Sequence, residues 1–562
     1  GDDFAPPEVP IVQWSAAYYY VREDEKEILL DVLRMGNLEQ PTTLFYQTVD
    51  DSATAGRKYV RVPPTRLHFL PGEMEKQIRV EIIDKSSWEP TLDFFVDLLE
   101  EGLDGATLGP CLYRAVVRIY DDDVFPTTKF QQEIRAKDLS RIPECRLMLE
   151  YLRMNFEDPE IRRRTIISVL LDQLHNAREL LLLYLNVYMV DNILQNPGDS
   201  TETRNYRLLM VVVANVVPFA LIHLAENMKA LLFGVSGRSR ANLELGLLRR
   251  FTNYNSKERE TFRRSDLTVA ITQDCTQLVH GGYGSFMEMM QLFGKLITVG
   301  VYQITMPLVF GNDLRPLAFV PLLVSPVAMV VILMLRNNVT KQAMSDVKRC
   351  QQAKLEHVDQ TVENYRLIAD FNQRRAIVQR YDEAVKLYNS AFRHLSQVTM
   401  NSTLLAWWVS LLLLVAYMYI GGKQVIREEM SLGVFLANVK IFTQVGQDWV
   451  CIYKLALAMM TSVPSLERIV GYMNKDTDLS QRSNVHRHRI RHTFESCERL
   501  RAGPCKNSMD AMDSIPIEVE NVSIPLVTSC WATGGVIRSN RIVAEEKLSI
   551  PQGKMVWVVG PH

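Results

Sequence analysis

The chain has 562 residues, and its 63 Lys and Arg nearly balance its 65 Asp and Glu, for a net charge of −2. That length leaves room for several domains, and a chain so near neutrality offers no bulk attraction to nucleic acid, which we exclude as a partner. The eight Cys form no CxxC pair and no Cys/His group at zinc spacing, which favours reduced thiols without a structural role.

Residues up to about 125 predict an antiparallel β-sandwich. Apolar residues alternate with polar ones in four runs: Ile28, Leu30 and Val32; Ile78, Val80 and Ile82; Phe94, Val96 and Leu98; Ala115, Val117 and Ile119. Turn clusters such as "GNLEQP", "LPGE" and "GLDGATLG" separate the runs. Period-two runs divided by turns in this way are typical of two packed sheets.

Acidic residues gather just beyond the predicted strand ends. They are Glu23, Asp50, Asp51, Asp84, Glu89, Asp121, Asp122 and Asp123. Strands of a sandwich end at two poles, so several of these carboxylates can converge and supply the roughly six to eight oxygens that Ca²⁺ prefers. The other interpretation, that acidic turns are simply solvated, stays open from these residues alone.

Residues 10–125 resemble a Calx-beta domain. The segments "DDSATAGRKY", "LHFLPGEMEKQIRVEIID", "GATLG" and "VRIYDDD" stand in that family's order and spacing. The resemblance implies Ca²⁺ at one pole of the sandwich, held by Glu23, Asp50, Asp84, Glu89, Asp121, Asp122 and Asp123. Lys85 departs from the pattern, because some members have a second Asp there, and its charge could replace one ion. Other members bind no calcium and act as adhesion or spacer modules.

Two short segments flank this region. Residues 1–9 resemble the end of a preceding Calx-beta copy, by comparison of "GDDFAPPEV" with "DDDVFPTTKF". Residues 126–160 are expected to form a helical linker.

Residues 161–473 predict six membrane spans. Four stretches without a charged residue, 208–225, 296–312, 316–335 and 395–422, are joined by two weaker candidates, 180–190 and 431–453. A span needs about 20 apolar residues, and a buried core helix could imitate one such stretch but not four. The sequence therefore predicts an integral, multi-pass membrane protein whose partner is the lipid bilayer.

The connections between these spans differ in length and charge. Two long ones, near 226–285 and 336–394, are helical in period and rich in Lys and Arg, and "RRR" at 162–164 precedes the first span. Basic loops favour the cytosolic side. We therefore expect the N-terminal β domain and the C-terminal segment in the cytosol.

This plan resembles that of an ATP-binding cassette (ABC) exporter over residues 160–562. The segments that carry the likeness are "DLTVAITQDCTQLV", "HVDQTVENYRLIADFNQ" and "SVPSLERIVGYM". The resemblance implies a second ABC half as partner, either in a homodimer or covalently linked, and two nucleotide domains that close on ATP with Mg²⁺.

The last segment, 515–562, is similar to the first strands of a nucleotide-binding domain. Apolar residues 556–559 lead into Gly560, as a strand leads into a phosphate-binding loop. Gly560, Pro561 and His562 are then the start of the Walker A loop. The loop's Lys and Ser/Thr and the other catalytic motifs are missing from the sequence, so we expect a fragment that cannot itself hydrolyse ATP. Leu526 stands where the family has an adenine-stacking aromatic, a role that Trp531 could take.

Further residues receive roles from this resemblance or from the cost of charge in a bilayer. Short helices at the two hairpin tips, near 251–264 and 364–372, couple to the nucleotide domains in the family, which implies coupling roles for Tyr365, Arg366 and Phe371. Ordinary cytosolic packing is the alternative. Lys440 and Lys295 fall in predicted spans, where a charge faces either a substrate path or a partner residue.

The segment 474–514 turns polar and contains "HRHRIRH". A metal or an anionic lipid could bind it, but a flexible basic linker is favoured.

The sequence therefore predicts a multidomain protein: a β-sandwich, an all-α six-helix transmembrane domain and the beginning of an α/β nucleotide-binding domain. Its predicted function is ATP-driven export by an ABC half that calcium regulates. The alternative is a membrane-anchored Calx-beta scaffold with a degenerate, non-hydrolysing cassette. The transported substrate cannot be inferred.

Overall fold

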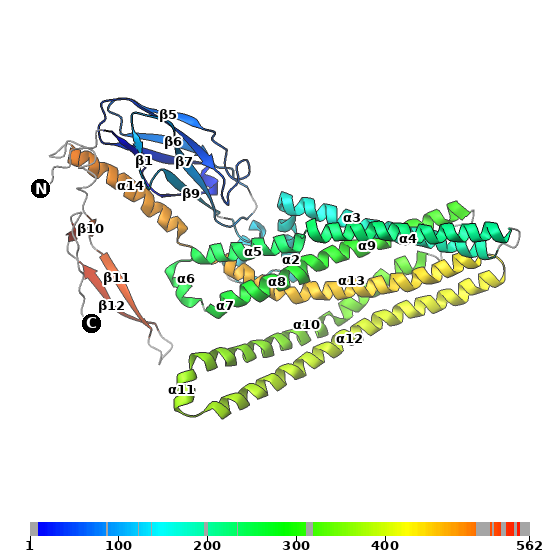
Figure 1. The fold of residues 1–562 in the computed structure, drawn as a ribbon. Helices are drawn as coiled ribbons and strands as arrows, with labels where there is room; N and C mark the ends of the chain where they lie inside the picture. Colours follow the sequence, from blue (N-terminus) through cyan, green and yellow to red (C-terminus); the bar gives the residue numbers. More distant parts are fainter. Residues whose placement is uncertain are drawn as a thin grey trace. The chain divides into compact units, whose positions relative to one another are not determined.

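A computed structural model describes residues 9–501 except 86–87, 122, 137, 196–199, 233, 263 and 311–318, together with 517–519, 522–529, 536–544 and 548–550. The chain divides into two compact units. One unit comprises Gly1–Phe125, Leu248–Thr261 and Lys475–His562, and the other comprises Pro126–Leu247 and Phe262–Asn474. Figure 1 traces the elements of both along the chain.

The N-terminal region is a two-sheet sandwich, as predicted. Its strands are β1 (Ile11–Trp14), β2 (Tyr18–Arg22), β3 (Glu27–Met35), β4 (Thr42–Val49), β5 (Thr65–Phe69), β6 (Glu75–Glu81), β7 (Leu92–Asp104), β8 (Thr107–Leu108) and β9 (Arg114–Tyr120). One sheet has the order β6-β3-β1-β8 and the other β2-β9-β7-β4-β5.

Two strand pairs of the sandwich are parallel, whereas the other pairs of its two sheets are antiparallel as predicted. Strand β1 pairs in parallel with β8, and β2 pairs in parallel with β9. The physical reason is a crossover, because β1 and β2 follow each other in the chain yet belong to different sheets. Strand β2 therefore lies at the edge of its sheet beside β9, whereas β1 lies between β3 and β8, and neither is joined to its parallel neighbour by a hairpin.

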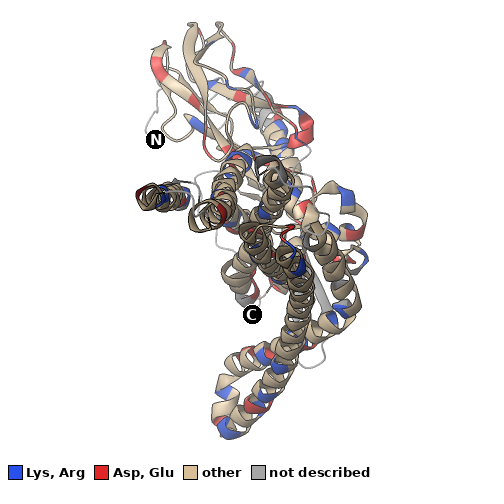
Figure 2. Ribbon diagram, turned by 90° about the vertical axis from the view of Figure 1, so that its right-hand side faces the viewer, with Lys and Arg blue, Asp and Glu red and all other residues tan. Residues whose placement is uncertain are grey.

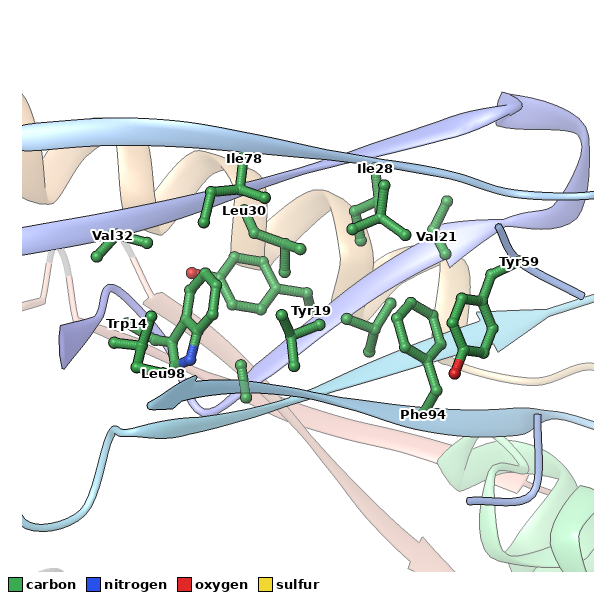
Figure 3. Close-up of a cluster of buried hydrophobic side chains, with 14 of the residues drawn as sticks. Trp14, Tyr19, Val21, Ile28, Leu30, Val32, Tyr59, Ile78, Phe94 and Leu98 are labelled. Atoms are coloured by element: carbon green, nitrogen blue, oxygen red, sulfur yellow. The ribbon is translucent and has the colours of Figure 1, made fainter. Parts of the chain in front are cut away.

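The sandwich core is built from the side chains that alternate inward along these strands (Figure 3). Trp14, Leu30, Val80 and Phe94 are fully buried. The ring of Tyr59 stacks on that of Phe94, with centroids 4.0 Å apart and an angle of 12° between the ring planes. This core is contributed by both sheets, which fixes the two polar ends of the sandwich where loops meet.

The second unit consists mainly of long helices at the positions predicted for spans. They are α3 (Pro159–Tyr188), α4 (Thr201–Leu232), α9 (Ser285–Phe310), α10 (Val320–Glu363), α12 (Arg374–Ile426) and α13 (Leu432–Met473), with the shorter α2 (Glu144–Glu157) before them. Within the described residues, Thr201–Lys229, α12 and α13 are long and apolar enough to cross a membrane. A fourth candidate is α10, which bends by 52° between Leu322–Arg336 and Asn338–Glu363. Two predicted spans, 180–190 in α3 and 296–312 in α9, do not meet that criterion within the described residues.

Both predicted hairpin tips contain short helices. Helices α5 (Val235–Thr252), α6 (Ser256–Thr261) and α7 (Arg264–Val269) cover the first, and α11 (Tyr365–Asp370) joins α10 to α12 at the second. Figure 2 shows bands of basic and acidic residues at the α11 end of the α10–α12 hairpin. Between α7 and α9 the backbone contains two π-helical turns, Ala270–Asp274 and Leu278–Gly284, separated by α8 (Cys275–Gln277).

The polar segment after α13 is helical over much of its length rather than a flexible linker. Helix α14 spans Leu479–Arg501 and contains neither Gly nor Pro, so nothing in it breaks a helix. Beyond it, β10 (Ile517–Val519) pairs with β13 (Leu548–Ile550), and β11 (Val522–Ser529) pairs with β12 (Val536–Ala544).

Replacement of Phe94 by Ala tests the sandwich core. We expect the free energy of unfolding of the sandwich to fall by about 3–5 kcal/mol, because the change removes a fully buried ring and its stacking contact with Tyr59. Urea-dependent proteolysis of the detergent-solubilised chain measures this. Tyr113→Ala is the control, since that side chain is 44% exposed, and an equal loss in both variants would contradict the assigned core.

Candidate functional site

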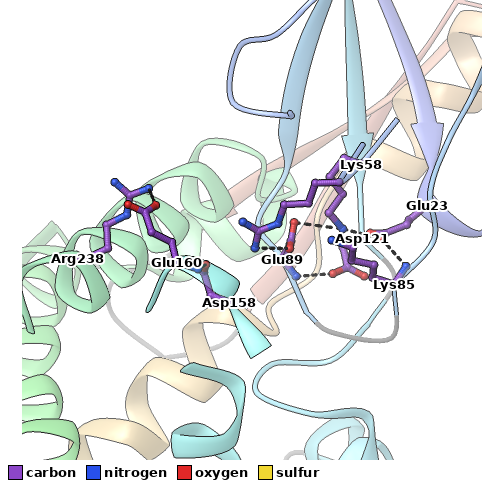
Figure 4. A network of polar contacts seen from close by, with 9 residues as sticks. Glu23, Lys58, Lys85, Glu89, Asp121, Asp158, Glu160 and Arg238 are labelled. Carbon is purple, nitrogen blue, oxygen red and sulfur yellow. Dashed lines mark hydrogen bonds and ion pairs between the residues drawn. The ribbon is translucent and has the colours of Figure 1, made fainter. Parts of the chain in front are cut away.

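One pole of the sandwich gathers charged side chains from four connections (Figure 4). Glu23 begins the single 3₁₀ turn Glu23–Glu25 between β2 and β3. Lys58 follows the "ATAG" turn after β4, Glu89 precedes β7, and Asp121 directly follows β9. Gly56 adopts φ +77° in the "ATAG" turn, a left-handed conformation that lets the chain reverse and direct Lys58 back under the sheets.

The ammonium of Lys58 occupies the centre of this pole. Its Nζ lies 2.6 Å from Glu23 Oε1 and 3.2 Å from Glu89 Oε2. The side chains of Lys58 and Glu23 are 1% and 2% exposed. Arg57 also approaches Glu89, at 3.1 Å from Oε1. The pole is therefore a neutralised ionic cluster, in which buried carboxylates are paired with cations from the chain itself.

Backbone N–H groups also donate to the carboxylates of this pole. Lys85 donates its backbone N–H to Glu23 Oε1 at 2.9 Å, and the N–H groups of Glu89 and Asp123 donate to the two oxygens of Asp121 at 2.6 and 2.7 Å. Burial raises the pKa of Asp121 to about 7, although these two donors act in the opposite direction. Burial also raises the pKa of Glu23, against the lowering effect of Lys58.

The structure brings together only some of the predicted calcium ligands. Glu23, Glu89 and Asp121 converge. Asp50 turns away: Arg61 lies 2.9 Å from its Oδ2, and the hydroxyl of Tyr59 donates to Oδ1, which lowers the pKa of this carboxyl. Asp84 is exposed, Asp123 contributes its backbone N–H, and Asp122 lies outside the described residues.

The described part of this pole does not fit a resident metal ion. Among the described residues, no three His, Cys, Asp or Glu side chains are arranged to hold one. The reason is local, because the oxygens that would face an ion already face Lys58. The expected substitute cation, Lys85, contributes only a backbone donor there, and Lys58 was missed. Its signal in the sequence was weak: a Lys beside the inward-facing Tyr59 in "GRKY".

The helical unit contains a second set of buried polar contacts, between α9 and α13. Lys295 Nζ lies 3.0 Å from Asp448 Oδ1, and these side chains are 19% and 7% exposed. Asp448 Oδ2 is buried and has no hydrogen-bond partner among the described residues. Between the same two helices, Gln303 donates to Asn438 at 3.2 Å. Lys295 therefore has a partner across the helix interface, while Lys440 is an exposed residue of α13.

A third contact joins two motifs that sequence analysis quoted separately. Arg468, in "SVPSLERIVGYM", donates from Nε to Asp274 Oδ2 at 2.8 Å, and Asp274 belongs to "DLTVAITQDCTQLV". Ser465 donates to the other oxygen of Asp274 at 3.1 Å. Asp274 is 1% exposed, so this pair fastens the end of α13 to the π-helical segment. Neither partner was predicted to meet the other.

The predicted coupling residues lie at an exposed tip. Tyr365 begins α11 and is 61% exposed, Arg366 follows it, and Phe371 immediately after α11 is 70% exposed. The predicted nucleotide-binding residues Gly560, Pro561 and His562 lie outside the described residues.

Two protein-family models match parts of this chain. Residues 165–448 match the model described as the ABC transporter transmembrane region, and this match covers half of the chain. The chain belongs to this ABC transporter family. Residues 7–123 match the Calx-beta domain, so the predicted order of a Calx-beta sandwich before an ABC transmembrane region is confirmed.

The similar curated proteins match the sandwich of this ABC chain. The sodium/calcium exchanger Calx of Drosophila melanogaster is 30% identical over 123 residues, which is 22% of this chain and 13% of that exchanger. Sodium/calcium exchanger 2 of Homo sapiens is 34% identical over 144 residues, 23% of this chain and 15% of that exchanger. The chain thus matches only a small part of these relatives' length.

Two solved structures are also similar in sequence to part of this chain. The crystal structure of the apo-form Calx CBD1 domain is 30% identical, covers 21% of this chain and 100% of its own, and has a TM-score of 0.20. The crystal structure of the calcium binding domain CBD12 of CALX1.1 is 29% identical over 20% of this chain and 44% of its own, with a TM-score of 0.19.

Replacement of Lys295 by Met tests the ion pair between α9 and α13. It leaves Asp448 buried without a counter-charge, so we expect a loss of about 3–5 kcal/mol in stability, seen as a lower midpoint of thermal unfolding in detergent. Lys440→Met, at an exposed site, should change the midpoint little. The swap Lys295→Asp with Asp448→Lys should recover part of the loss. An unchanged midpoint in Lys295→Met would mean that the pair does not stabilise the α9–α13 interface.

Proposed function

We propose that this chain forms one half of an ATP-driven exporter and pairs with a second ABC half in the bilayer. The membrane-spanning helices and the family match support a membrane transporter. The observation that carries ATP-driven movement is the exposed apolar tip at α11, held at the end of two long antiparallel helices. A closing nucleotide domain would push on such a tip, and the rigid hairpin would transmit the displacement.

In this proposal the sandwich and the tips α6 and α11 lie in the cytosol. The basic character of the connections that contain these tips supports this orientation. ATP with Mg²⁺ would supply the free energy of the cycle from the cassette that begins in 515–562, with Gly560, Pro561 and His562 as the first residues of its loop. Lys295, Asp448 and the exposed Lys440 are the proposed polar groups beside the substrate path.

The tip residues give the test. The chain is expressed with the coding sequence that follows His562 in its gene, reconstituted in nanodiscs, and assayed for Mg²⁺-dependent ATP hydrolysis. Phe371→Ala and Tyr365→Ala should each lower the rate at least about tenfold, since each removes a large apolar contact worth on the order of 1–3 kcal/mol. Leu387→Ala is the matched control, because Leu387 is 64% exposed on α12 away from the tip.

Two outcomes oppose this proposal. An equal fall in Leu387→Ala would show that the tip has no special role. A natural protein that binds nucleotide without hydrolysing it, or that has no intact cassette, would favour the membrane-anchored Calx-beta scaffold instead.

We further propose that Lys58 stands in for calcium at the charged pole. The names of the relatives connect this type of domain with calcium, but here the converging carboxylates already hold an ammonium. The sandwich should therefore bind Ca²⁺ weakly as long as Lys58 is present. Removal of the ammonium would leave Glu23 and Glu89 as uncompensated anions, which a divalent cation could neutralise.

Binding of ⁴⁵Ca²⁺ to the detergent-solubilised chain tests this proposal. We expect a Kd for the unmodified chain on the order of a millimolar, in the range of weak calcium modules, and a Kd at least about tenfold lower for Lys58→Gln. Lys85→Gln removes a neighbouring ammonium that feels Glu89 and Glu23 only at longer range, so its Kd should fall much less than that of Lys58→Gln. Micromolar binding by the unmodified chain, unaltered in Lys58→Gln, would contradict the substitution.

A further inference from the structure

Helix α14 is docked on the sandwich through its first half. His486 lies against the rings of Tyr19 and Tyr20 in edge-on contacts, with ring centroids 5.6 and 5.8 Å apart. The next residue, Arg487, reaches Glu25 Oε2 at 2.6 Å. These contacts are made with β2 and with the 3₁₀ turn that follows it, at one edge of the sandwich.

Helix α14 also borders a cavity. It has a volume of about 860 Å³ and lies between the helix and strands β3 and β6, with Ile28, Asp31, Gln77, Ile490 and Arg491 among its lining residues. Ile490 is partly buried against the sandwich core. An exposed ion pair stabilises by about 0.2–1 kcal/mol, and edge-on aromatic pairs by amounts of the same order. The described contacts of α14 are thus an exposed ion pair, two edge-on ring contacts and the partly buried Ile490, beside a cavity, and contacts of this kind can be released at a modest cost in free energy.

The chain just before α14 is fastened to the first hairpin tip. Lys475 Nζ pairs with Glu258 Oε2 of α6 at 2.6 Å. Thr477 forms an antiparallel β-bridge with Tyr254, a residue that is fully buried. Two backbone hydrogen bonds complete the joint, from Asn255 to the carbonyl of Asp476 at 3.2 Å and from Asp478 to the carbonyl of Asn253 at 3.1 Å.

The docking contact and the charged pole share a single turn. Glu23 and Glu25 belong to the same 3₁₀ turn, which ends at Lys26 with φ 61°. Glu23 points inward to Lys58, and Glu25 pairs outward with Arg487. Because one turn of backbone carries both carboxylates, a displacement that follows loss of the Lys58–Glu23 pair also moves the partner of Arg487.

We propose that α14 is a releasable strut, which docks on the β2 edge of the sandwich and transmits the state of the charged pole to the α6 tip. The route runs from Lys58 and Glu23 through the turn to Glu25, then through Arg487 and α14 to the joint at 475–478. This inference goes beyond the proposed function, since it requires neither ATP hydrolysis nor a bound calcium ion.

Hydrogen exchange of the whole chain in nanodiscs tests the docking contact. Arg487→Glu places two acidic groups opposite each other, and should speed amide exchange about fivefold in 479–487 and in 253–261, as loss of an interaction of about 1 kcal/mol predicts. Arg489→Glu is the charge-matched control on the same helix, and we expect less than a twofold change. The swap Glu25→Arg with Arg487→Glu should restore protection in both segments.

The same measurement tests the connection to the pole. Lys58→Gln should speed exchange at least about threefold in 479–487 and 253–261, while peptides from β7 keep their protection and so show that the sandwich stays folded. If β7 loses protection, Lys58→Arg, which keeps the charge but changes its reach, replaces it under the same criterion. The strut is overturned if Arg487→Glu loosens 479–487 and leaves 253–261 unchanged, or if the swap restores nothing. Unchanged exchange in α14 after the change at Lys58 overturns the connection to the pole. Because exchange is read without nucleotide, failure here is distinct from failure to hydrolyse ATP.

Discussion

Removal of an ammonium group from water is among the costliest steps in folding, and the sandwich does this with Lys58. The group is tolerated because two carboxylates receive it and the surrounding oxygens are held by backbone donors. The arrangement fixes the conformations of three loops at once, since Glu23, Lys58 and Glu89 come from different connections. The pole is thereby ordered by the chain's own charges. Because Glu23 and Glu25 belong to one turn, this cluster also orients Glu25, which pairs with Arg487 of α14.

The sequence predicted the parts of the structure that depend on repeating patterns. Alternation in strands such as β3 and β7 identifies a sandwich because one face must be buried, and uncharged stretches identify α4 and α12 because a bilayer accepts little else. These signals are redundant, so single departures do not hide them. The motifs of the Calx-beta and ABC families then supplied the order of the domains, which the family comparisons confirm.

Contacts that depend on one side chain's direction were not predictable in this way. Lys58 and Lys85 both lie near the acidic loops in sequence, and nothing in the sequence shows that the ammonium of Lys58 enters the pole. Asp448 and Lys295 are 153 residues apart, and no local sequence pattern predicts that they pair. The parallel strand pairs and the helical form of α14 were missed for related reasons: a crossover between sheets leaves no periodic trace, and a polar helix without a strong apolar stripe resembles a linker.

The length of α12 has a mechanical consequence. Its 53 residues form one helix, which at about 1.5 Å per residue extends some 80 Å, while the hydrocarbon core of a bilayer is about 30 Å thick. With the uncharged stretch 395–422 in the bilayer, residues 374–394 form a rod of about 30 Å on the α11 side, paired along its length with α10. A tilt of only about 5° within the bilayer would carry the far end of such a rod through about 3 Å. The hairpin thus acts as a lever. A small tilt of the helices within the bilayer becomes a larger displacement of the α11 tip.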